Sequence, residues 1–428
     1  MSSSSKSLAA RRVLEKRIEI IKDKFYWICD SVPPSGFEDS FYFCVDNDLT
    51  YTPYHRDFGP LHIGNIFKYV TEVERLMRVK TGASTILYHY TDPKSDKRTN
   101  ACLLALAYQV IIMDVSAEVA WRNFTEQCNI KIDEYIEAGY RPNDYRCSVL
   151  DCLRGLEYAI KLGWFNLAKF NVKEYNFYEK IENGDLNWIV PGKFIAFSTP
   201  CDSPKKNGHR FFTAEALTPV LKKHGVKLVV RLNDPLYNEH VMKRNGIDHL
   251  DVFFEDGSCP GPEQISAFIR AAETCNGPIG VHCKAGLGRT GTLIGLYLMK
   301  HFNVPAPALI GWMRLCRPGM VLGSQQFFLC KMQAEMFREG YKVKLSKGVP
   351  SSLLTTMSKA AHETSLRVNR RTSTINFYEK EENQADRLIN MKDAHTKIER
   401  PRSVLAARSN LVYKPSFYVA PRVNKTRN

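Results

Sequence analysis

The stretch that decides the fold is Ile279-Gly-Val-His-Cys-Lys-Ala-Gly-Leu-Gly-Arg-Thr-Gly-Thr292. It opens with an apolar run typical of a buried strand, passes through a turn with two glycines, and continues into an apolar helical segment at 291–302. Further elements are predicted around it, strands at 226–232 and 249–254 and helices at 306–315 and 323–340. Strands that alternate with helices predict an α/β fold around a largely parallel sheet.

The turn in this stretch has the composition of a site for one phosphate group. Gly286 and Gly288 allow backbone N–H groups to fold inward around an anion, and the following helix adds the positive end of its dipole. The planar guanidinium of Arg289 can bind two phosphate oxygens at once. The predicted phosphate-binding residues are Lys284, Ala285, Gly286, Leu287 and Gly288.

Cys283 is the predicted nucleophile, because the field that binds phosphate also stabilises a thiolate. A single cysteine is more often a small buried hydrophobe, but the nine-residue pattern in a strand–turn–helix context favours catalysis. Thr290 is predicted to donate a hydrogen bond to the departing sulfur, and it can also cap the helix. His282 is predicted to orient the loop by hydrogen bonding and not to act as a base.

A thiol displacement needs an acid to protonate the departing alkoxide. Asp256 follows a predicted strand and lies 27 residues before Cys283, so it is the predicted general acid. Glu255 is the competing candidate, and Asp256 could instead cap its turn. Gln325 and Gln326 begin a predicted helix, where either could position the attacking water or simply lie on the surface.

An upstream stretch repeats the same order of features. His89-Tyr-Thr-Asp-Pro-Lys-Ser-Asp-Lys-Arg-Thr99 also lies between a predicted strand and an apolar helix, and Tyr90 stands where the later copy has Cys283. We interpret the chain as two domains of one fold, of which only the second kept its nucleophile. The alternative is two unrelated α/β units with a chance match.

Composition limits the class of protein. The 428 residues are 44% hydrophobic, and the longest nearly apolar run, 103–113, is far shorter than the ~20 residues that cross a bilayer. The N-terminus lacks the apolar region of a secretion signal. The 12 cysteines show neither a disulfide framework nor metal-ligand spacing, so a reducing, intracellular compartment is predicted, with no metal or other cofactor.

Charge is concentrated at the C-terminal end. The chain carries +15, of which residues 341–428 contribute +11. Past residue 350 too few apolar positions remain for a core, so a mostly disordered basic tail is predicted. The tail could bind anionic partners or be only a solvated extension, and Arg370-Arg-Thr-Ser373 resembles a kinase site on Ser373.

Residues 282–290 fit the pattern H-C-x-x-G-x-x-R-[ST] of cysteine-dependent phosphatases. With 253–258, 182–189 and 317–319, the chain resembles the cell-division-cycle-fourteen dual-specificity phosphatases over roughly residues 12–345. The resemblance implies tandem phosphatase-like domains, with catalysis in the second through a thiophosphate intermediate. The implied organisation is a disordered N-terminus at 1–11, a degenerate N-terminal domain at 12–168, a linker helix at 169–184, a catalytic domain at 185–345 and a disordered basic tail at 346–428.

The resemblance also implies substrates. Members of this family act on phosphoserine- and phosphothreonine-proline sites made by cyclin-dependent kinases, and on phosphotyrosine, and they favour a basic residue shortly after the proline. Glu179 and Asp185 match two carboxylates of the acidic groove that binds it, but Asn176 replaces a third acid, so the preference could be weaker. Glu174 or Glu182 could compensate, and a merely solvated helix face is the alternative.

The implied setting is the cell cycle and mitotic exit, in the nucleus and cytoplasm, including the nucleolus, centrosome, spindle or the base of the cilium. Residues 176–183 recur at 376–383 with seven of eight positions identical. This repeat suggests either that the tail mimics the linker or that the match is coincidental.

Three other functions are alternatives to this one. A phosphoinositide phosphatase usually has a second lysine where this loop has Leu287, and an acidic linker would repel a polyphosphorylated head group. An RNA 5′-phosphatase would need more basic residues in the loop, and no nucleic acid partner is expected for the folded body. A phosphoprotein-binding scaffold would not need Cys283, Arg289 and Asp256 together.

Overall fold

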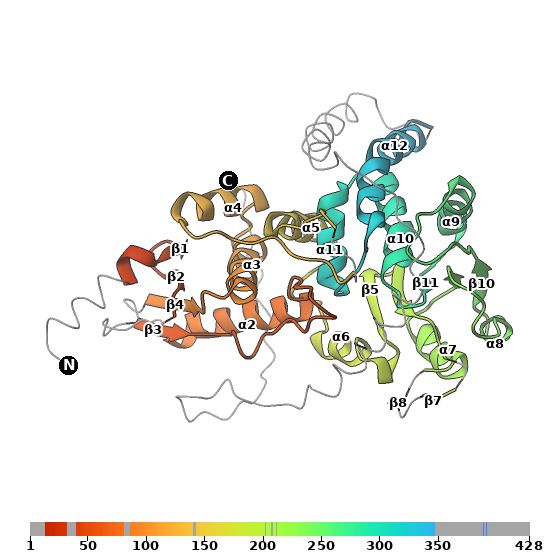
Figure 1. Ribbon diagram of the computed structural model, residues 1–428, viewed down its shortest axis with the longest axis horizontal. Helices are drawn as coiled ribbons and strands as arrows, with labels where there is room; N and C mark the ends of the chain where they lie inside the picture. The colour runs from red at the N-terminus through yellow and green to blue at the C-terminus, as the bar shows by residue number, and fades with distance from the viewer. Residues whose placement is uncertain are drawn as a thin grey trace, which may run out of the picture.

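The computed structural model describes residues 13–31, 40–80, 86–139, 143–201, 203–206, 209–210 and 212–346, together with residues 388 and 391. The predicted disordered N-terminus lies outside the described residues. So do Ser373, the repeat copy at 376–383 and the rest of the predicted tail apart from Ser346, Leu388 and Met391. Figure 1 shows two α/β units side by side, as the sequence predicts.

The N-terminal unit has a four-stranded sheet in the order β1-β2-β4-β3. Strands β1 and β2 form an antiparallel hairpin, and the other neighbours pair in parallel. Its strands are β1 Ile18–Ile21, β2 Phe25–Cys29, β3 Ser40–Phe43 and β4 Ile86–Thr91. Its helices are α2 Ile63–Lys80, α3 Ser95–Ile112, α4 Ala117–Gln127 and α5 Val149–Lys161.

The C-terminal unit has a five-stranded sheet in the order β10-β9-β11-β6-β5, in which only β5 and β6 pair antiparallel. The strands of this unit are β5 Leu186–Val190, β6 Phe194–Ser198, β9 Leu228–Arg231, β10 Asp248–Asp251 and β11 Ile279–Cys283, with a separate pair β7 Lys205–Lys206 and β8 His209–Arg210. The helices are α7 Ala214–Lys223, α8 His240–Lys243, α9 Pro262–Thr274, α10 Gly288–Phe302, α11 Ala306–Cys316 and α12 Ser324–Ser346.

The two sheets confirm the duplication predicted from the sequence. In each sheet an antiparallel hairpin lies at one edge, and the strand that carries His89 or His282 pairs with the second strand of that hairpin. On its other side, the histidine strand pairs in parallel with β3 in the N-terminal unit and with β9 in the C-terminal unit. A helix then leaves the histidine strand directly, α3 after β4 and α10 after β11.

Between the two units lies a short helix, α6 Val172–Tyr178, followed by a 3₁₀ turn η1 at Ile181–Asn183. Both lie inside the predicted linker. Asn171 caps α6 by accepting a hydrogen bond from the Glu174 N–H. Tyr175 fixes the helix to the C-terminal unit, since its hydroxyl donates to the Cys316 carbonyl oxygen at 2.9 Å.

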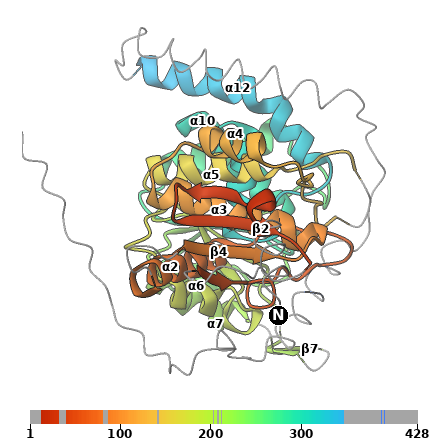
Figure 2. The same cartoon turned by 90° about the vertical axis from the view of Figure 1, so that its left-hand side faces the viewer.

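Helices α5 and α11 join the units through close backbone contact and lie next to each other in Figure 1 (Figure 2 shows the same fold from the side of the N-terminal unit). A Cβ atom on Gly155 would lie 2.3 Å from the Ala308 carbonyl oxygen, and one on Gly311 would lie 2.6 Å from the Asp151 carbonyl oxygen. Any side chain at either position would collide with backbone, which cannot rotate away. Glycine therefore sets how closely the two units approach.

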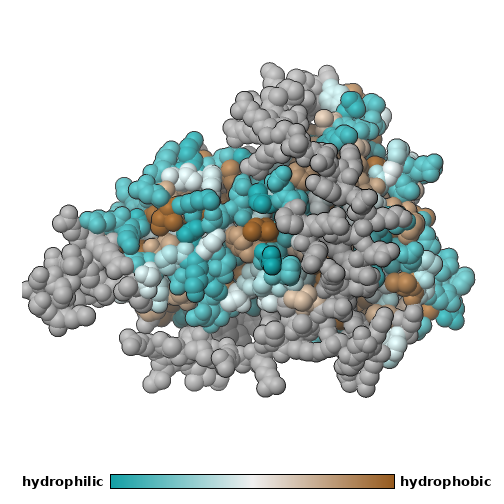
Figure 3. All heavy atoms as spheres, in the orientation of Figure 1, coloured by the Kyte–Doolittle hydropathy of each residue, from teal (hydrophilic) through white to brown (hydrophobic). Residues whose placement is uncertain are grey.

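The described residues on one face of the molecule are mostly hydrophilic (Figure 3). Figure 3 shows mainly hydrophilic residues on the described part of this face, with hydrophobic residues in small separate patches. Within the described residues, no helix is both long and apolar enough to cross a membrane.

Gly155→Val tests the interface between the units. We expect a loss of roughly 2–3 kcal/mol in the free energy of unfolding, the upper part of the usual range for overpacking, because the clash is with backbone. Urea unfolding measures it, with Lys161→Val on the exposed end of the same helix as control. Equal stability of the two variants would show that the units are not packed as described.

Candidate active site

The predicted loop lies at the carboxyl end of β11, the central strand of its sheet. Strand β11 pairs in parallel with β6 on one side and β9 on the other, and Cys283 is its last residue. Helix α10 begins at Gly288, three residues before the predicted start, so its first turn belongs to the loop. The carboxyl ends of parallel strands are where open α/β sheets place their ligand sites.

Two glycines shape the loop. Gly286 has φ +66°, and a Cβ atom there would lie 2.1 Å from the Phe197 carbonyl oxygen, so no other residue fits. A Cβ atom on Gly288 would lie 2.6 Å from Oε1 of Gln325. The loop is therefore enclosed by β6 on one side and by the start of α12 on the other.

Arg317 holds the loop from behind, and it is a residue whose role the sequence analysis did not identify. Its buried guanidinium donates to the carbonyl oxygens of Gly286 at 2.9 Å and Ala285 at 3.0 Å. It also forms an ion pair with Asp185 at 3.0 Å and donates to Asn187 Oδ1 at 2.7 Å. With these carbonyls turned toward Arg317, the loop can present its N–H groups on the other side.

Arg289 and Asp256, the predicted phosphate clamp and general acid, contact each other at the loop. Arg289 NH2 lies 3.0 Å from Oδ1 of Asp256, and Arg289 NH1 donates to the Phe254 carbonyl oxygen at 2.9 Å. Arg289 is buried, whereas about a third of the Asp256 side chain is exposed. The carboxylate thus lies at the mouth of the site, next to the guanidinium. Glu255 precedes it on the same loop and is exposed.

Three buried polar atoms around the loop have no hydrogen-bond partner among the described residues. They are Arg289 Nε, Thr290 Oγ1 and Gln325 Oε1. Buried polar atoms are normally paired, so unpaired ones gathered at one loop mark a place for a ligand or water. An anion bound in the loop would accept a hydrogen bond from Arg289 Nε, and a thiolate on Cys283 would accept one from the Thr290 hydroxyl.

The two glutamines differ in their surroundings. Gln325 donates to the Ser258 carbonyl oxygen at 2.9 Å, which places it beside both the loop and the segment that carries Asp256. Gln326 instead donates to Glu137 of the N-terminal unit at 2.9 Å and accepts from Arg314. The arrangement favours Gln325 for positioning water and leaves Gln326 a structural contact between the units.

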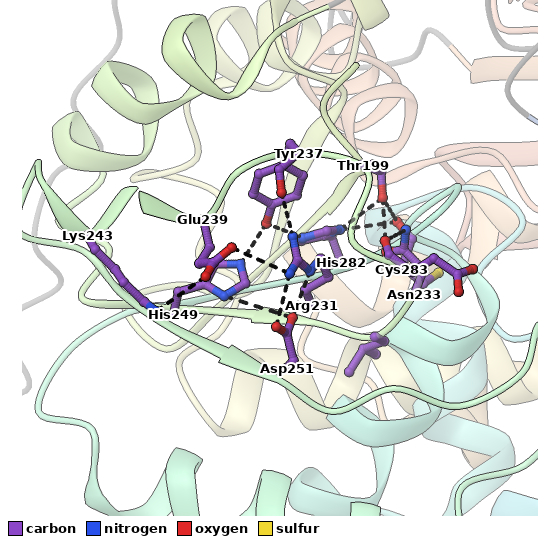
Figure 4. Close-up of polar contacts among 12 residues, drawn as sticks. Thr199, Arg231, Asn233, Tyr237, Glu239, Lys243, His249, Asp251, His282 and Cys283 are labelled. Carbon is purple, nitrogen blue, oxygen red and sulfur yellow. Dashed lines mark hydrogen bonds and ion pairs between the residues drawn. The ribbon is translucent and has the colours of Figure 1, made fainter. Parts of the chain in front are cut away.

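His282 anchors the loop from the protein interior (Figure 4). Its Nε2 lies 2.8 Å from the Tyr237 hydroxyl, which also lies 2.9 Å from Nε2 of His249. Thr199 lies on its other side, 3.1 Å from Nδ1, and donates to the Cys283 carbonyl oxygen at 2.8 Å. Burial lowers the pKa of His282 to about 3, so the ring is neutral near neutral pH and holds the loop through these hydrogen bonds.

Behind Tyr237, Arg231 closes this network. It is buried, forms a two-pronged ion pair with Asp251 at 2.7 and 2.9 Å, and donates to the Tyr237 carbonyl oxygen at 2.8 Å. Burial and the neighbouring Arg231 charge lower the pKa of His249 to about 4. The network in Figure 4 therefore keeps both histidines uncharged near neutral pH.

The predicted groove acids lie in the linker. Asp185 is buried against Arg317, so it supports the loop through that guanidinium. Glu179 is 30% exposed, and its Oε1 lies 3.7 Å from Nε2 of His62 in the N-terminal unit. Asn176, in place of a third acid, is partly exposed on α6. Of the two matched carboxylates, only Glu179 can also reach a bound peptide.

In the N-terminal unit, the position that corresponds to the phosphate loop holds the carboxylate of Asp133. Tyr90 replaces the nucleophile, and Arg98 NH2, at the start of α3, donates to Asp133 Oδ2 at 2.6 Å. Ser95 donates to the same carboxylate at 2.6 Å. His89 keeps a tyrosine partner, Tyr69, at 2.9 Å. A protein carboxylate thus lies at the helix start in this unit, so phosphate would have to displace it.

Comparison with known proteins agrees with this arrangement. Residues 19–159 match the family model of the dual specificity protein phosphatase N-terminal half, and residues 212–335 match the dual specificity phosphatase catalytic domain. The chain is 39% identical to dual specificity protein phosphatase CDC14AB of Danio rerio, over 75% of this chain and 53% of that protein. It is 37% identical to CDC14C of Homo sapiens, over 72% of this chain and 69% of that protein.

Among solved structures, the active form of Tk-PTP is 24% identical with a TM-score of 0.30, covering 35% of this chain and 96% of that one. The chain spans about half the length of the first of the two relatives.

The buried histidines predict how stability depends on pH. Burial lowers the pKa of His89 to about 3, as it does for His282, and His249 titrates near 4. The unfolded chain binds protons on all three below about pH 6.5 and the folded chain does not, so stability falls as pH falls. Between pH 6 and 5, each histidine should lower the free energy of unfolding by about 1.4 kcal/mol for each pH unit of acidification.

Urea unfolding at pH 7.5, 6.5, 5.5 and 5.0 measures this slope. In His249→Asn the free energy of unfolding should change less steeply with pH, by the amount that corresponds to about one bound proton. An identical slope in that variant would mean that His249 is protonated in the folded chain.

Proposed function

Because this chain belongs to the CDC14 family of dual specificity phosphatases, we propose that it is a cysteine-dependent phosphoprotein phosphatase. The observation that carries the proposal is Cys283 at the start of a glycine-shaped loop, with Arg289 Nε buried and unpaired beside it and Asp256 3.0 Å from the same guanidinium. Nucleophile, anion clamp and acid come together from three separate parts of the sequence.

In the first step, the thiolate of Cys283 attacks phosphorus and the bond from phosphorus to the substrate oxygen breaks. Asp256 gives its proton to that oxygen, which leaves as an alcohol. The guanidinium of Arg289 and the loop N–H groups bind the phosphoryl oxygens as charge develops on them. A phosphate on Arg289 competes with the Asp256 carboxylate for the same guanidinium, which releases Asp256 to meet the leaving oxygen.

In the second step, water attacks the thiophosphate and Asp256 takes its proton. The sulfur–phosphorus bond breaks, and the Thr290 hydroxyl, otherwise unpaired, donates to the departing thiolate. Gln325 lies beside both the loop and the Ser258 carbonyl and positions the water. Phosphate then leaves and Cys283 is restored.

For substrates we propose phosphoserine- and phosphothreonine-proline sites of the cyclin-dependent-kinase type, and phosphotyrosine, from the family resemblance. Glu179 supports a basic residue after the proline, since it is a partly exposed acid of the linker, whereas Asp185 is buried. The same resemblance and the names of the relatives support a cell-cycle role. On the same basis we propose the nucleus, cytoplasm, centrosome and spindle as its setting.

Leu287 weighs against a phosphoinositide substrate. It is fully buried and lies in a cluster with Tyr54 and Ala138 of the N-terminal unit. A lysine at this position would have to bury its charged end in that cluster, at a cost in desolvation. The loop therefore carries Lys284 but no second lysine at position 287 for the additional phosphates of such a lipid.

The proposal is tested with a phosphoserine-Pro-x-Lys peptide, the same peptide with alanine for proline, and a phosphoinositide, all with a chelator present. We expect turnover selective for the proline peptide. Cys283→Ser should abolish it, and Asp256→Ala should lower the rate about 10²–10⁴-fold. The matched control is Glu255→Ala, which should change the rate little. Preferred lipid turnover, or none on all three substrates, would contradict the proposal.

Glu179→Gln tests the groove. The variant should lose part of its preference for phosphoserine-Pro-x-Lys over phosphoserine-Pro-x-Ala, by roughly 2–5-fold in the ratio of kcat/KM, as expected for one partly exposed ion pair. Its rate on the alanine peptide should stay unchanged. Glu215→Gln, at an exposed position on α7, is the control. An unchanged ratio in Glu179→Gln would remove Glu179 from recognition.

A further inference from the structure

A small buried apolar cluster, which we call the notch, lies where the phosphate loop meets the N-terminal unit. Its walls are Tyr54 and Ala138 from the N-terminal unit, Ala285 and Leu287 from the loop, and Leu322 before α12. The notch is held firmly, because the Tyr54 hydroxyl donates to the Pro318 carbonyl oxygen at 3.1 Å and a Cβ on Gly319 would lie 3.0 Å from the Tyr54 ring.

One residue of the C-terminal tail fills this notch. Leu388 is only 5% exposed and belongs to the same cluster as Ala285 and Leu287, although it lies 101 residues after Leu287 in the sequence. Its backbone is helical, as is that of Met391 three residues later. Met391 is 36% exposed, so the tail presents one of these two apolar side chains to the notch and the other to solvent.

We propose that the tail docks on the enzyme in cis through Leu388 and competes with phosphopeptide substrates for the surface beside the phosphate loop. Two walls of the notch are loop residues, so a peptide with its phosphate in the loop has to pass next to it. A leucine there occupies space that a substrate side chain needs. The inference rests on the proposed function, since it takes this loop as the active site.

Tethering makes such a contact effective even though it is small. A segment linked to its own site is present at a high effective concentration, typically millimolar for a flexible linker. Docking lowers the fraction of molecules that can bind substrate, and the apparent KM rises by the inverse of that fraction. A modification of the tail, or a partner that binds it, would then change the apparent KM by changing how often Leu388 is docked.

The test compares the full chain with Leu388→Ser, and with Met391→Ser as the matched control. On the phosphoserine-Pro-x-Lys peptide, Leu388→Ser should lower KM by roughly 5–10-fold, as expected if about nine molecules in ten are docked. Met391→Ser should match the wild type. On p-nitrophenyl phosphate, which has no peptide to place beside the loop, the three proteins should differ much less.

A synthetic peptide of residues 383–393 is then added to Leu388→Ser. It should raise the KM for the phosphopeptide again, and the same peptide with serine at 388 should not. Equal KM values for all three proteins, or a Leu388→Ser variant that is less active than wild type, would overturn the inference. Absence of turnover in every protein would instead contradict the proposed function.

The docked state can also be tested without turnover. Trypsin should cleave after Arg387 faster in Leu388→Ser than in Met391→Ser, because burial of Leu388 shields the adjoining peptide bond in the control. Equal cleavage rates would overturn the docking whatever the activity of the protein.

Discussion

The Arg317 guanidinium is the contact on which the phosphate loop depends. From one buried position it binds the carbonyl oxygens of Gly286 and Ala285 and forms an ion pair with Asp185. A loop that is to bind an anion must turn its carbonyls away, and these carbonyls need a buried donor. Arg317 is that donor, and Asp185 neutralises it. The linker acid and the catalytic loop are therefore parts of one charge-balanced unit.

The N-terminal unit has Tyr90 at the position that corresponds to Cys283, and it helps to shape the site of the other unit. Asp133 pairs with Arg98 where phosphate would bind, so this unit is closed to the chemistry of the other. It contributes Glu137 to Gln326, and Tyr54 and Ala138 to the notch beside the loop. The glycine contacts between α5 and α11 keep these residues in place. The N-terminal unit therefore supports the active site of the C-terminal unit, and it provides part of the surface against which Leu388 packs.

Sequence analysis predicted the fold, the duplication and the loop, because glycine spacing and the strand–turn–helix order leave a strong local signal. Arg317 lay within a quoted motif, Arg317-Pro-Gly319, but its role depends on contacts with residues 31 or more positions away. Tyr237 and Thr199 lie in segments with no motif at all. Gln325 and Gln326 are adjacent in sequence and could be told apart only by the direction in which helix α12 turns each side chain.

If the loop makes Cys283 the nucleophile, the phosphoryl group is transferred to its sulfur during turnover, and this intermediate can be trapped. A phosphopeptide labelled in its phosphate is mixed with the protein, the reaction is stopped in acid within milliseconds, and the protein is digested and analysed by mass spectrometry. The account predicts the label on the peptide that contains Cys283, and none with Cys283→Ser. Turnover of the substrate with no label on Cys283 at any time would show direct attack by water and contradict the account.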